Sequence, residues 1–227
     1  MGEPEANLAR LIGAVDAKRT RFYVDSLTKD ARAQLGVLYR ELGGILDPMP
    51  SYYTGGWDIE LPDGRKVELD ETQHFNRYRV ISLQQEWARE LPWRGEYLDY
   101  SRRFEFVCWR VSSGGGGWTN PSAEEMFGSA GTGGVLEGAG SPRWRQRALY
   151  DATKDIAALH GAVRLARLSV WDSVDGVLLG NTLAGLAGVD KEALIGLLVS
   201  LRLGWGLSMT CVGLVPNPEP HAREIWH

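Results

Sequence analysis

Residues 57–70, WDIELPDGRKVELD, determine how the middle of this chain folds. Apolar and polar residues alternate on both sides of the PDG segment at 62–64, a pattern typical of two strands joined by a turn. If 62–64 form a three-residue loop with Gly64 in the left-handed conformation, Ile59 lies opposite Val67. A two-residue loop would set polar residues of one strand against apolar residues of the other. The sequence therefore predicts a β-hairpin in a single register.

This register creates an electrostatic problem at the open end of the hairpin. Asp58 lies opposite Glu68, with Cβ atoms roughly 5 Å apart, and like charges so placed are destabilising. Asp70 lies on the same face, two residues beyond Glu68. The three carboxylates need either solvent or a cation, and Mg²⁺ (or Mn²⁺) takes oxygen ligands of this kind. Two interpretations follow, a metal site and a solvated strand face.

The composition limits the class of protein. With 227 residues, 44% of them hydrophobic, the chain can bury a core and is not globally disordered. The net charge of −4 excludes a uniformly basic surface for nucleic acid but not a local basic patch. The acidic, polar N-terminus is not a signal peptide, and the most apolar run, 193–207, is too short to span a membrane. Cys108 and Cys211 predict buried thiols in a cytoplasmic protein.

Helical and extended patterns alternate along the rest of the chain. Helices are predicted at 5–18 and 28–45, and strands at 102–111, 162–170 and 208–215. The apolar stripe of the second helix consists of Ala31, Leu35, Leu38, Leu42 and Ile45. Between 112 and 142 the chain is glycine-rich, which favours a surface loop over a phosphate-binding loop, because no phosphate-loop spacing is present.

Two further helices begin at residues that can cap them. Ser141 followed by Pro142 is a typical start for a helix that has a basic first half and ends at Gly161. Asp190 is predicted to cap a last, apolar helix.

Two blocks of residues, in order, resemble a known superfamily. The first is an aspartate, Asp58, followed by VELDETQH at 67–74. The second is Asp151, Lys154 and Asp155 in a helix, followed by a strand that contains arginine. Together they resemble the PD-(D/E)XK nucleases, specifically the branch of the very-short-patch repair endonucleases and their uncharacterised bacterial relatives. The resemblance covers 50–80 and 141–172, and in it Asp70 occupies the position of the superfamily's lysine.

The resemblance implies an α/β fold in which a mixed central sheet, flanked by helices, forms a restriction endonuclease-like core with a glycine-rich insertion. The chain is then a single domain, 1–227. Its expected parts are N-terminal helices at 5–45, a nuclease-like core at 50–75 and 141–172, an insertion at 76–140 and a C-terminal helix and strand extension at 173–227.

The implied activity is Mg²⁺-dependent hydrolysis of DNA phosphodiester bonds, in DNA repair or in restriction. Asp58 and Glu68 would be the principal metal ligands, with Asp70 a third ligand or a partner of one. Gln73 or His74 would stand in for the lysine near the attacking water, and His74 is favoured because imidazole exchanges protons near neutral pH. Glu41, on the preceding helix, could be a further metal-site acid, but an ordinary solvated glutamate is favoured.

The expected partner is DNA, with a homodimer as one option, and a basic groove is expected to contact its backbone. A solvated basic face is the alternative for these side chains. The predicted contacts are Arg77, Arg79, Arg143, Arg145, Arg147 and Lys154. Two other functions remain open. One is a superfamily member that has lost cleavage and binds DNA or a protein. The other is an unrelated α/β protein with a decorated hairpin.

Overall fold

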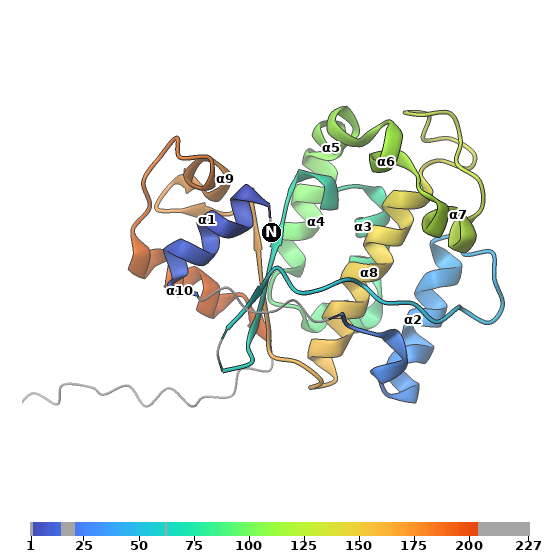
Figure 1. Cartoon of the computed structure of the whole chain (residues 1–227), viewed down its shortest axis with the longest axis horizontal. Helices are drawn as coiled ribbons and strands as arrows, with labels where there is room; N and C mark the ends of the chain where they lie inside the picture. Colours follow the sequence, from blue (N-terminus) through green and yellow to red (C-terminus); the bar gives the residue numbers. More distant parts are fainter. Residues whose placement is uncertain (1, 15–20, 62, 204–227) are drawn as a thin grey trace, which may run out of the picture.

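The computed structural model describes residues 2–14, 21–61 and 63–203, which form a mixed α/β structure with a small sheet flanked by helices (Figure 1). The strands are β1 (Ile59–Glu60), β2 (Lys66–Asp70), β3 (Leu165–Ser169), β4 (Ser173–Val174), β5 (Val177–Leu178) and β6 (Arg202–Leu203). The α-helices are α1 (Glu3–Ile12), α2 (Lys29–Glu41), α3 (Arg77–Gln84), α4 (Arg94–Arg103), α5 (Glu105–Ser112), α6 (Gly115–Trp118), α7 (Pro121–Phe127), α8 (Pro142–Leu159), α9 (Leu179–Leu183) and α10 (Lys191–Ser200). Short 3-10 helices are η1 (Val24–Ser26), η2 (Thr72–His74) and η3 (Glu86–Glu90).

The hairpin has the register predicted from its sequence. Ile59 pairs with Val67 in antiparallel fashion, and the amide of Leu61 donates to the carbonyl of Arg65 at 2.8 Å. Gly64 has a φ of 82°, the left-handed conformation that glycine adopts without steric cost. The prediction is confirmed, and it fixes the face on which each side chain of β2 lies.

The four-stranded sheet has the order β1-β2-β3-β6 and is mixed. β2 and β3 are parallel, whereas β1 and β6 are antiparallel to their neighbours. A parallel pair needs a long crossover connection, and α8 is the last element of the one between β2 and β3. In the parallel register Glu68 lies beside Arg167, and Asp70 beside Ser169.

Helix α8 begins as its sequence predicts. The Ser141 hydroxyl accepts a hydrogen bond from the amide of Trp144 at 3.1 Å and donates one to the carbonyl of Trp118 at 2.6 Å. Pro142 occupies the first turn, where its missing N–H costs nothing. The predicted cap of α10 is also present, because Asp190 accepts from the amide of Ala193 at 2.8 Å.

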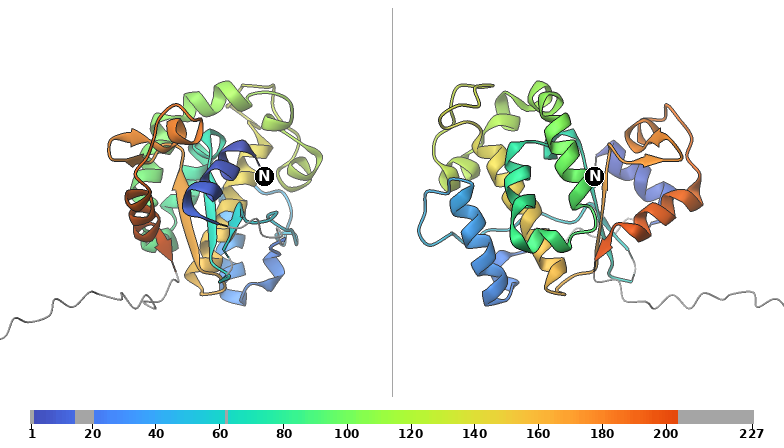
Figure 2. Two further views of the ribbon diagram at one scale, coloured as in Figure 1. Left: turned by 60° about the vertical axis from the view of Figure 1, so that its left-hand side comes forward. Right: turned by 180° about the vertical axis from the view of Figure 1, so that it is seen from behind.

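Helices cover both faces of the sheet: α1, α9 and α10 lie on one side, and α2 to α8 on the other (Figures 1 and 2). Val67 and Leu69 of β2 pack with Ala166 and Leu168 of β3 against the first group. The intervening residues of β2, Glu68 and Asp70, face the second group. They are 3% and 0% exposed, because α8 covers this face of the strand. The alternative prediction of a solvated strand face is therefore wrong.

The predicted strand at 102–111 is wrong, because these residues form the end of α4 and most of α5. Its aromatic and β-branched side chains suggested a strand, but Cys108 and Ser112, one helical turn apart, are both buried. The glycine-rich segment is not a bare loop either, since it contains α6 and α7 and buries Trp118. In helix α2, Ile45 falls beyond the helix end and is 60% exposed.

Two predictions fall partly or wholly outside the described residues. Helix α1 ends at Ile12, and residues 15–18 of its predicted range are not described. The predicted strand at 208–215, including Cys211, also lies outside, whereas Cys108 is buried as expected. Within the described part of the chain, the helices are all too short or too polar to cross a membrane.

Candidate functional site

Asp58 and Glu68 meet on one side of the hairpin. The backbone amide of Asp58 donates to Oε1 of Glu68 at 3.2 Å, and the amide of Leu69 donates to Oδ2 of Asp58 at 2.9 Å. Each carboxylate is therefore anchored to the opposite strand. The predicted juxtaposition of these two acids is present.

Helix α8 supplies a cation to this pair. Nζ of Lys154 lies 2.6 Å from Oε2 of Glu68 and 3.1 Å from the carbonyl oxygen of Gly56, and 5.2 Å from the ring centre of Trp57. Lys154 is only 6% exposed, so it does not belong to an outer DNA-binding face as predicted. It is part of the site itself, because α8 lies across the charged face of β2.

The two carboxyl groups hold their negative charge at a cost. Burial, together with nearby Asp58 and against the influence of Lys154, raises the pKa of Glu68 to about 7. Burial also raises the pKa of Asp58, again against the influence of Lys154. A second positive charge beside the pair would therefore stabilise its ionised form.

Asp70 does not share the environment of the other two acids. Its two carboxylate oxygens lie 2.7 and 2.6 Å from Nη1 of Arg167, which projects from the neighbouring strand β3. The role expected for Asp70, a third ligand beside Asp58 and Glu68 or a partner of one of them, stays a prediction. Its charge is already compensated by a buried guanidinium that is 0% exposed.

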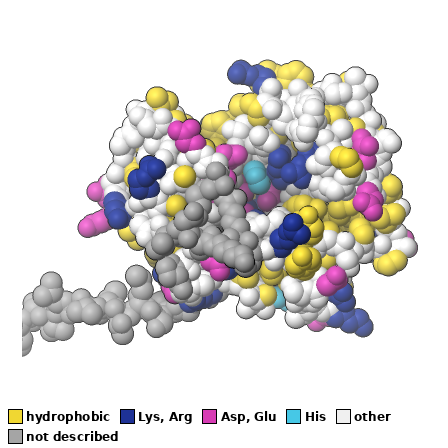
Figure 3. Space-filling view, viewed as in Figure 1, with side chains coloured by type: hydrophobic (Ala, Val, Ile, Leu, Met, Phe, Trp, Pro, Cys, Tyr) yellow, Lys and Arg dark blue, Asp and Glu magenta, His cyan; other side chains and the backbone are white. Residues whose placement is uncertain are grey.

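His74 lies at the end of η2, between two acids. Its Nδ1 is 2.9 Å from Oδ2 of Asp151 and 3.2 Å from Oδ1 of Asp70. Burial opposes the imidazolium form, but Asp151 and Asp70 outweigh burial and raise the pKa of His74. The side chain is 23% exposed, and Figure 3 shows histidine beside acidic and basic side chains in a hollow near the middle of that face.

Behind His74, buried acidic and basic side chains form a network of ion pairs. Arg167 donates from Nε to Oδ1 of Asp155 at 2.7 Å, and Arg79 donates to the other oxygen of Asp155 at 2.9 Å. Arg79 is 0% exposed, so its predicted role as a DNA contact is wrong: it is an interior counterion. Among the described residues, Asp70, Asp151 and Asp155 thus face Arg79, Arg167 and His74.

Among the described residues, two groups of side chains are candidate positions for a metal ion. Asp70, His74 and Asp151 each offer a ligand atom within 4.8 Å of the others, but Nδ1 of His74 already bridges the two acids there. Asp58 and Glu68 offer only oxygen atoms, which is the ligand set that Mg²⁺ prefers. Burial is the main cause of the raised pKa values of Asp58 and Glu68, and a cation beside the pair would lower them.

The rim of the site contains Gln73 and Arg147. Arg147, on α8, donates to the carbonyl oxygen of Gln73 at 3.1 Å and to its Oε1 at 2.9 Å. Burial lowers the pKa of Arg147, and the nearby charge of Arg143 lowers it further. Gln73 therefore holds an arginine beside His74 instead of facing the carboxylate pair directly.

The other predicted DNA-contacting arginines are at least partly exposed and already have partners. These partners are Glu105 for Arg77 at 2.8 Å, Gln146 for Arg143 at 2.6 Å and the ring of Tyr78 for Arg145 at 5.2 Å from its centre. Arg143 and Arg145, like Arg147, lie on the first two turns of α8, whereas Arg77 pairs with α5. The structure thus collects three of the five predicted arginines on one helix.

Sequence reasoning missed the positions of two acids near the site. Glu71 is half-buried, and burial together with nearby Glu5 of α1 raises its pKa. No periodicity in the sequence links 5 with 71, so only the packing of α1 on the sheet reveals this proximity. Glu41 lies elsewhere: it accepts a hydrogen bond from Gln85 at 2.6 Å and is an exposed surface glutamate, as favoured.

Comparison with known proteins gives one match. No curated protein and no solved structure matches the chain. A protein family matches residues 37–185, a range that contains the hairpin, η2, α8 and β3, and with them the candidate site. The chain belongs to this family of unknown function, DUF7255.

Proposed function

We propose that this protein is a metal-dependent nuclease that hydrolyses DNA phosphodiester bonds on a restriction endonuclease-like core of β1, β2, α8 and β3. The observation that carries the proposal is the convergence of the two sequence blocks. His74 of the first lies 2.9 Å from Asp151 of the second, and Glu68 lies 2.6 Å from Lys154. A hairpin followed by a crossover helix and a parallel strand brings them together.

Asp58 and Glu68 would hold the ion. Mg²⁺ or Mn²⁺, when bound, neutralises phosphate charge and lowers the pKa of a bound water. The carboxylates can accept more than one contact per oxygen, so the hydrogen bonds from Asp58 N–H, Leu69 N–H and Lys154 leave lone pairs for an ion. These same hydrogen bonds fix the orientation of both acids before an ion binds.

Lys154 would take the role of the superfamily's lysine, whose position on β2 is occupied by Asp70. Its ammonium is held between Glu68 and the carbonyl oxygen of Gly56, beside the carboxylate pair. There it can stabilise negative charge that develops on a phosphate or on an attacking oxygen. Because Lys154 is buried and held by both contacts, its ammonium group has a fixed position.

His74 would exchange a proton with the substrate. Its Nδ1 is held by Asp151 and Asp70, which leaves Nε2 as the nitrogen that can face a substrate. Because the acids raise the pKa of His74, the ring is suited to donate a proton to a leaving oxygen near neutral pH. Arg147 beside Gln73 adds positive charge at the same rim.

The ion pair between Lys154 and Glu68 also favours a second candidate function. Lys154 already compensates the charge of Glu68 at 2.6 Å, so the fold itself does not require a divalent ion. In that case the protein would bind DNA or a protein partner through the same face without cutting it. The two functions differ in whether Asp58 and Glu68 bind a metal ion.

A plasmid-nicking assay with Mg²⁺ or Mn²⁺ tests the proposal. We expect the wild type to nick supercoiled DNA, and Asp58→Asn and Glu68→Gln to lose nicking while keeping their circular dichroism spectra. Asp25→Asn is the matched control, because this acid is half-exposed and pairs only with Arg32 among described residues. Nicking that persists in EDTA, or that survives both site substitutions, would contradict the proposal.

A further inference from the structure

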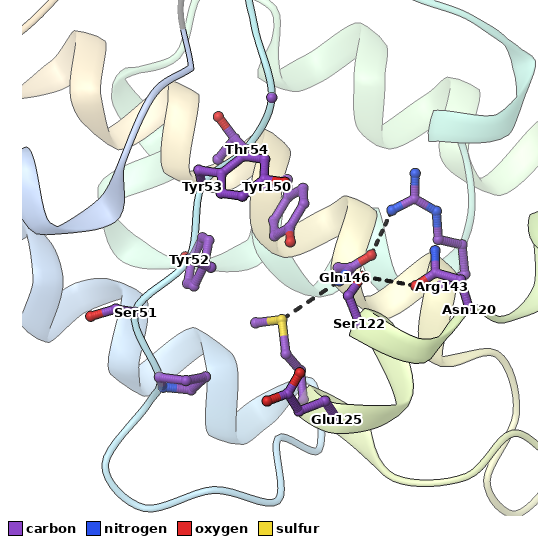
Figure 4. Close-up of a pocket in the computed structure, with 13 residues that line it drawn as sticks. Ser51, Tyr52, Tyr53, Thr54, Asn120, Ser122, Glu125, Arg143, Gln146 and Tyr150 are labelled. Atoms are coloured by element: carbon purple, nitrogen blue, oxygen red, sulfur yellow. Dashed lines mark hydrogen bonds between the residues drawn. The ribbon is translucent and has the colours of Figure 1, made fainter.

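A pocket of about 560 Å³ lies next to the candidate site, between residues 50–55, α7 and the first half of α8 (Figure 4). None of the residues proposed for metal binding or proton transfer lines this pocket. One wall consists of tyrosines, and the other of Arg143 with the hydrogen-bonding side chains of Asn120, Ser122 and Gln146 and the acid Glu125. Such a combination of flat aromatic surface and positive charge is the one that proteins use to bind single-stranded nucleic acid.

The aromatic wall is already ordered for stacking. The rings of Tyr52 and Tyr150 stack with centroids 5.3 Å apart and an angle of 15° between their planes. The hydroxyl of Tyr52 lies 2.8 Å from Oγ1 of Thr153, which fixes Tyr52 to α8. Tyr53, next in the chain, is 44% exposed; its ring lies 5.8 Å from that of Tyr23, and the guanidinium of Arg21 lies over it at 4.5 Å.

The polar wall holds its arginine in place. Arg143 donates to Oε1 of Gln146 at 2.6 Å, and Nε2 of Gln146 donates to the hydroxyl of Ser122 at 3.1 Å. Gln146 is 0% exposed, so this network is buried at its base while the guanidinium lies in the pocket wall (Figure 4). An arginine fixed in this way loses little entropy when it binds a phosphate.

The pocket and the carboxylate pair are connected by short, ordered segments. Residues 55–58 lead from the pocket to Asp58, a span of at most roughly 10 Å for three residues. Along α8, Arg143 and Lys154, which contacts Glu68, are roughly 16 Å apart, because a helix rises 1.5 Å per residue.

We infer that this pocket binds an unstacked nucleobase, and its phosphate, of the strand that is cut beside Asp58 and Glu68. The inference rests on the proposed function and adds to it a substrate class: DNA with a locally single-stranded segment. Tyr52 and Tyr150 would form the stacking surface. Arg143 would bind a phosphate of the same strand.

Fluorescence anisotropy in EDTA, where no cleavage occurs, tests the inference. The probe is a fluorescein-labelled duplex with a central three-nucleotide single-stranded gap, compared with the fully paired duplex. We expect the wild type to bind the gapped probe more tightly. Tyr150→Leu should weaken that binding about 5- to 150-fold, as expected for loss of one stacked base, while Tyr150→Phe should bind as the wild type does.

Phe106→Leu is the matched control, because Phe106 is an aromatic residue 64% exposed on α5 and does not line the pocket. It should bind the gapped probe normally. Should Tyr150→Leu fail to fold, Tyr53→Leu at an exposed position of the same pocket replaces it. Unchanged binding in the pocket variant, or equal affinity of the wild type for both probes, would overturn the inference and leave the nuclease proposal standing. A wild type that binds neither probe would contradict the nuclease proposal itself.

Discussion

Nζ of Lys154 lies 2.6 Å from Oε2 of Glu68, although the two residues are 86 positions apart. The contact joins the crossover helix to the strand that it covers, and both partners are almost fully buried. Burial of one charge alone would be costly, so each residue makes the position of the other possible. The pair therefore belongs both to the fold and to the proposed chemistry.

Replacing Lys154 by methionine should separate these two roles. Lys154→Met keeps the length of the side chain but removes the charge, so we expect DNA nicking to fall about 10²- to 10³-fold. The affinity for Mn²⁺ should not fall, because both carboxylates remain. Lys191→Met, at an exposed position of α10, serves as control and should nick DNA normally. A Lys154→Met protein with wild-type nicking would remove Lys154 from the mechanism.

Arg167 should be the most important single side chain for stability. It contacts Asp70 and Asp155 directly, so Arg167→Met leaves only His74 beside Asp70 and only Arg79 beside Asp155. We expect the free energy of unfolding, measured with urea, to fall by about 3–5 kcal/mol. Arg32→Met removes a salt bridge whose arginine is 47% exposed and should cost less than about 1 kcal/mol. Similar losses in the two variants would contradict this assignment.

Asp172 should make the protein less stable as the pH rises. Burial raises the pKa of Asp172 from 3.8 to about 6, so the unfolded chain releases this proton at lower pH than the folded protein does. Stability is lost between pH 4 and 6, and above pH 6 the penalty is on the order of 2–3 kcal/mol. Asp172→Asn avoids it and can still accept the hydrogen bond from the amide of Ser169.

Urea unfolding at pH 4 and pH 8 measures this effect. The Asp172→Asn variant should be more stable than the wild type at pH 8, and this advantage should shrink toward pH 4. Asp25→Asn, at an exposed acid, should show no such trend. If Asp172→Asn is less stable than the wild type at pH 8, the ionised carboxylate is required by the fold and the prediction is wrong.

Local patterns predicted the parts of this fold that local chemistry determines. The register of Ile59 with Val67 followed from the turn at Gly64, and the start of α8 followed from Ser141 and Pro142. The same reasoning gave a wrong prediction for residues 102–111, which are mostly helical. Their alternation suggests a strand, but packing of α4 and α5 against α3 and η2 decides for helix.

The residues of the candidate site could be predicted better than the contacts between its acids and its cations. Asp58 opposite Glu68 needed only the hairpin register. The contact between Asp70 and Arg167 needed the register of two parallel strands, which no spacing along the chain provides. Lys154 and Arg79 were likewise predicted to be surface cations, because charged side chains are usually solvated. Both are buried, because each lies on the face of its helix that packs against the interior.

Binding of Mn²⁺, followed by electron paramagnetic resonance of the free ion, tests the central claim most directly. If Asp58 and Glu68 form the ion site, the wild type and His74→Gln will bind Mn²⁺, whereas Asp58→Asn and Glu68→Gln will not. Normal Mn²⁺ binding by Asp58→Asn together with loss of binding in His74→Gln would place the ion at Asp70, His74 and Asp151 instead. That result would contradict the assignment of the carboxylate pair as the metal site.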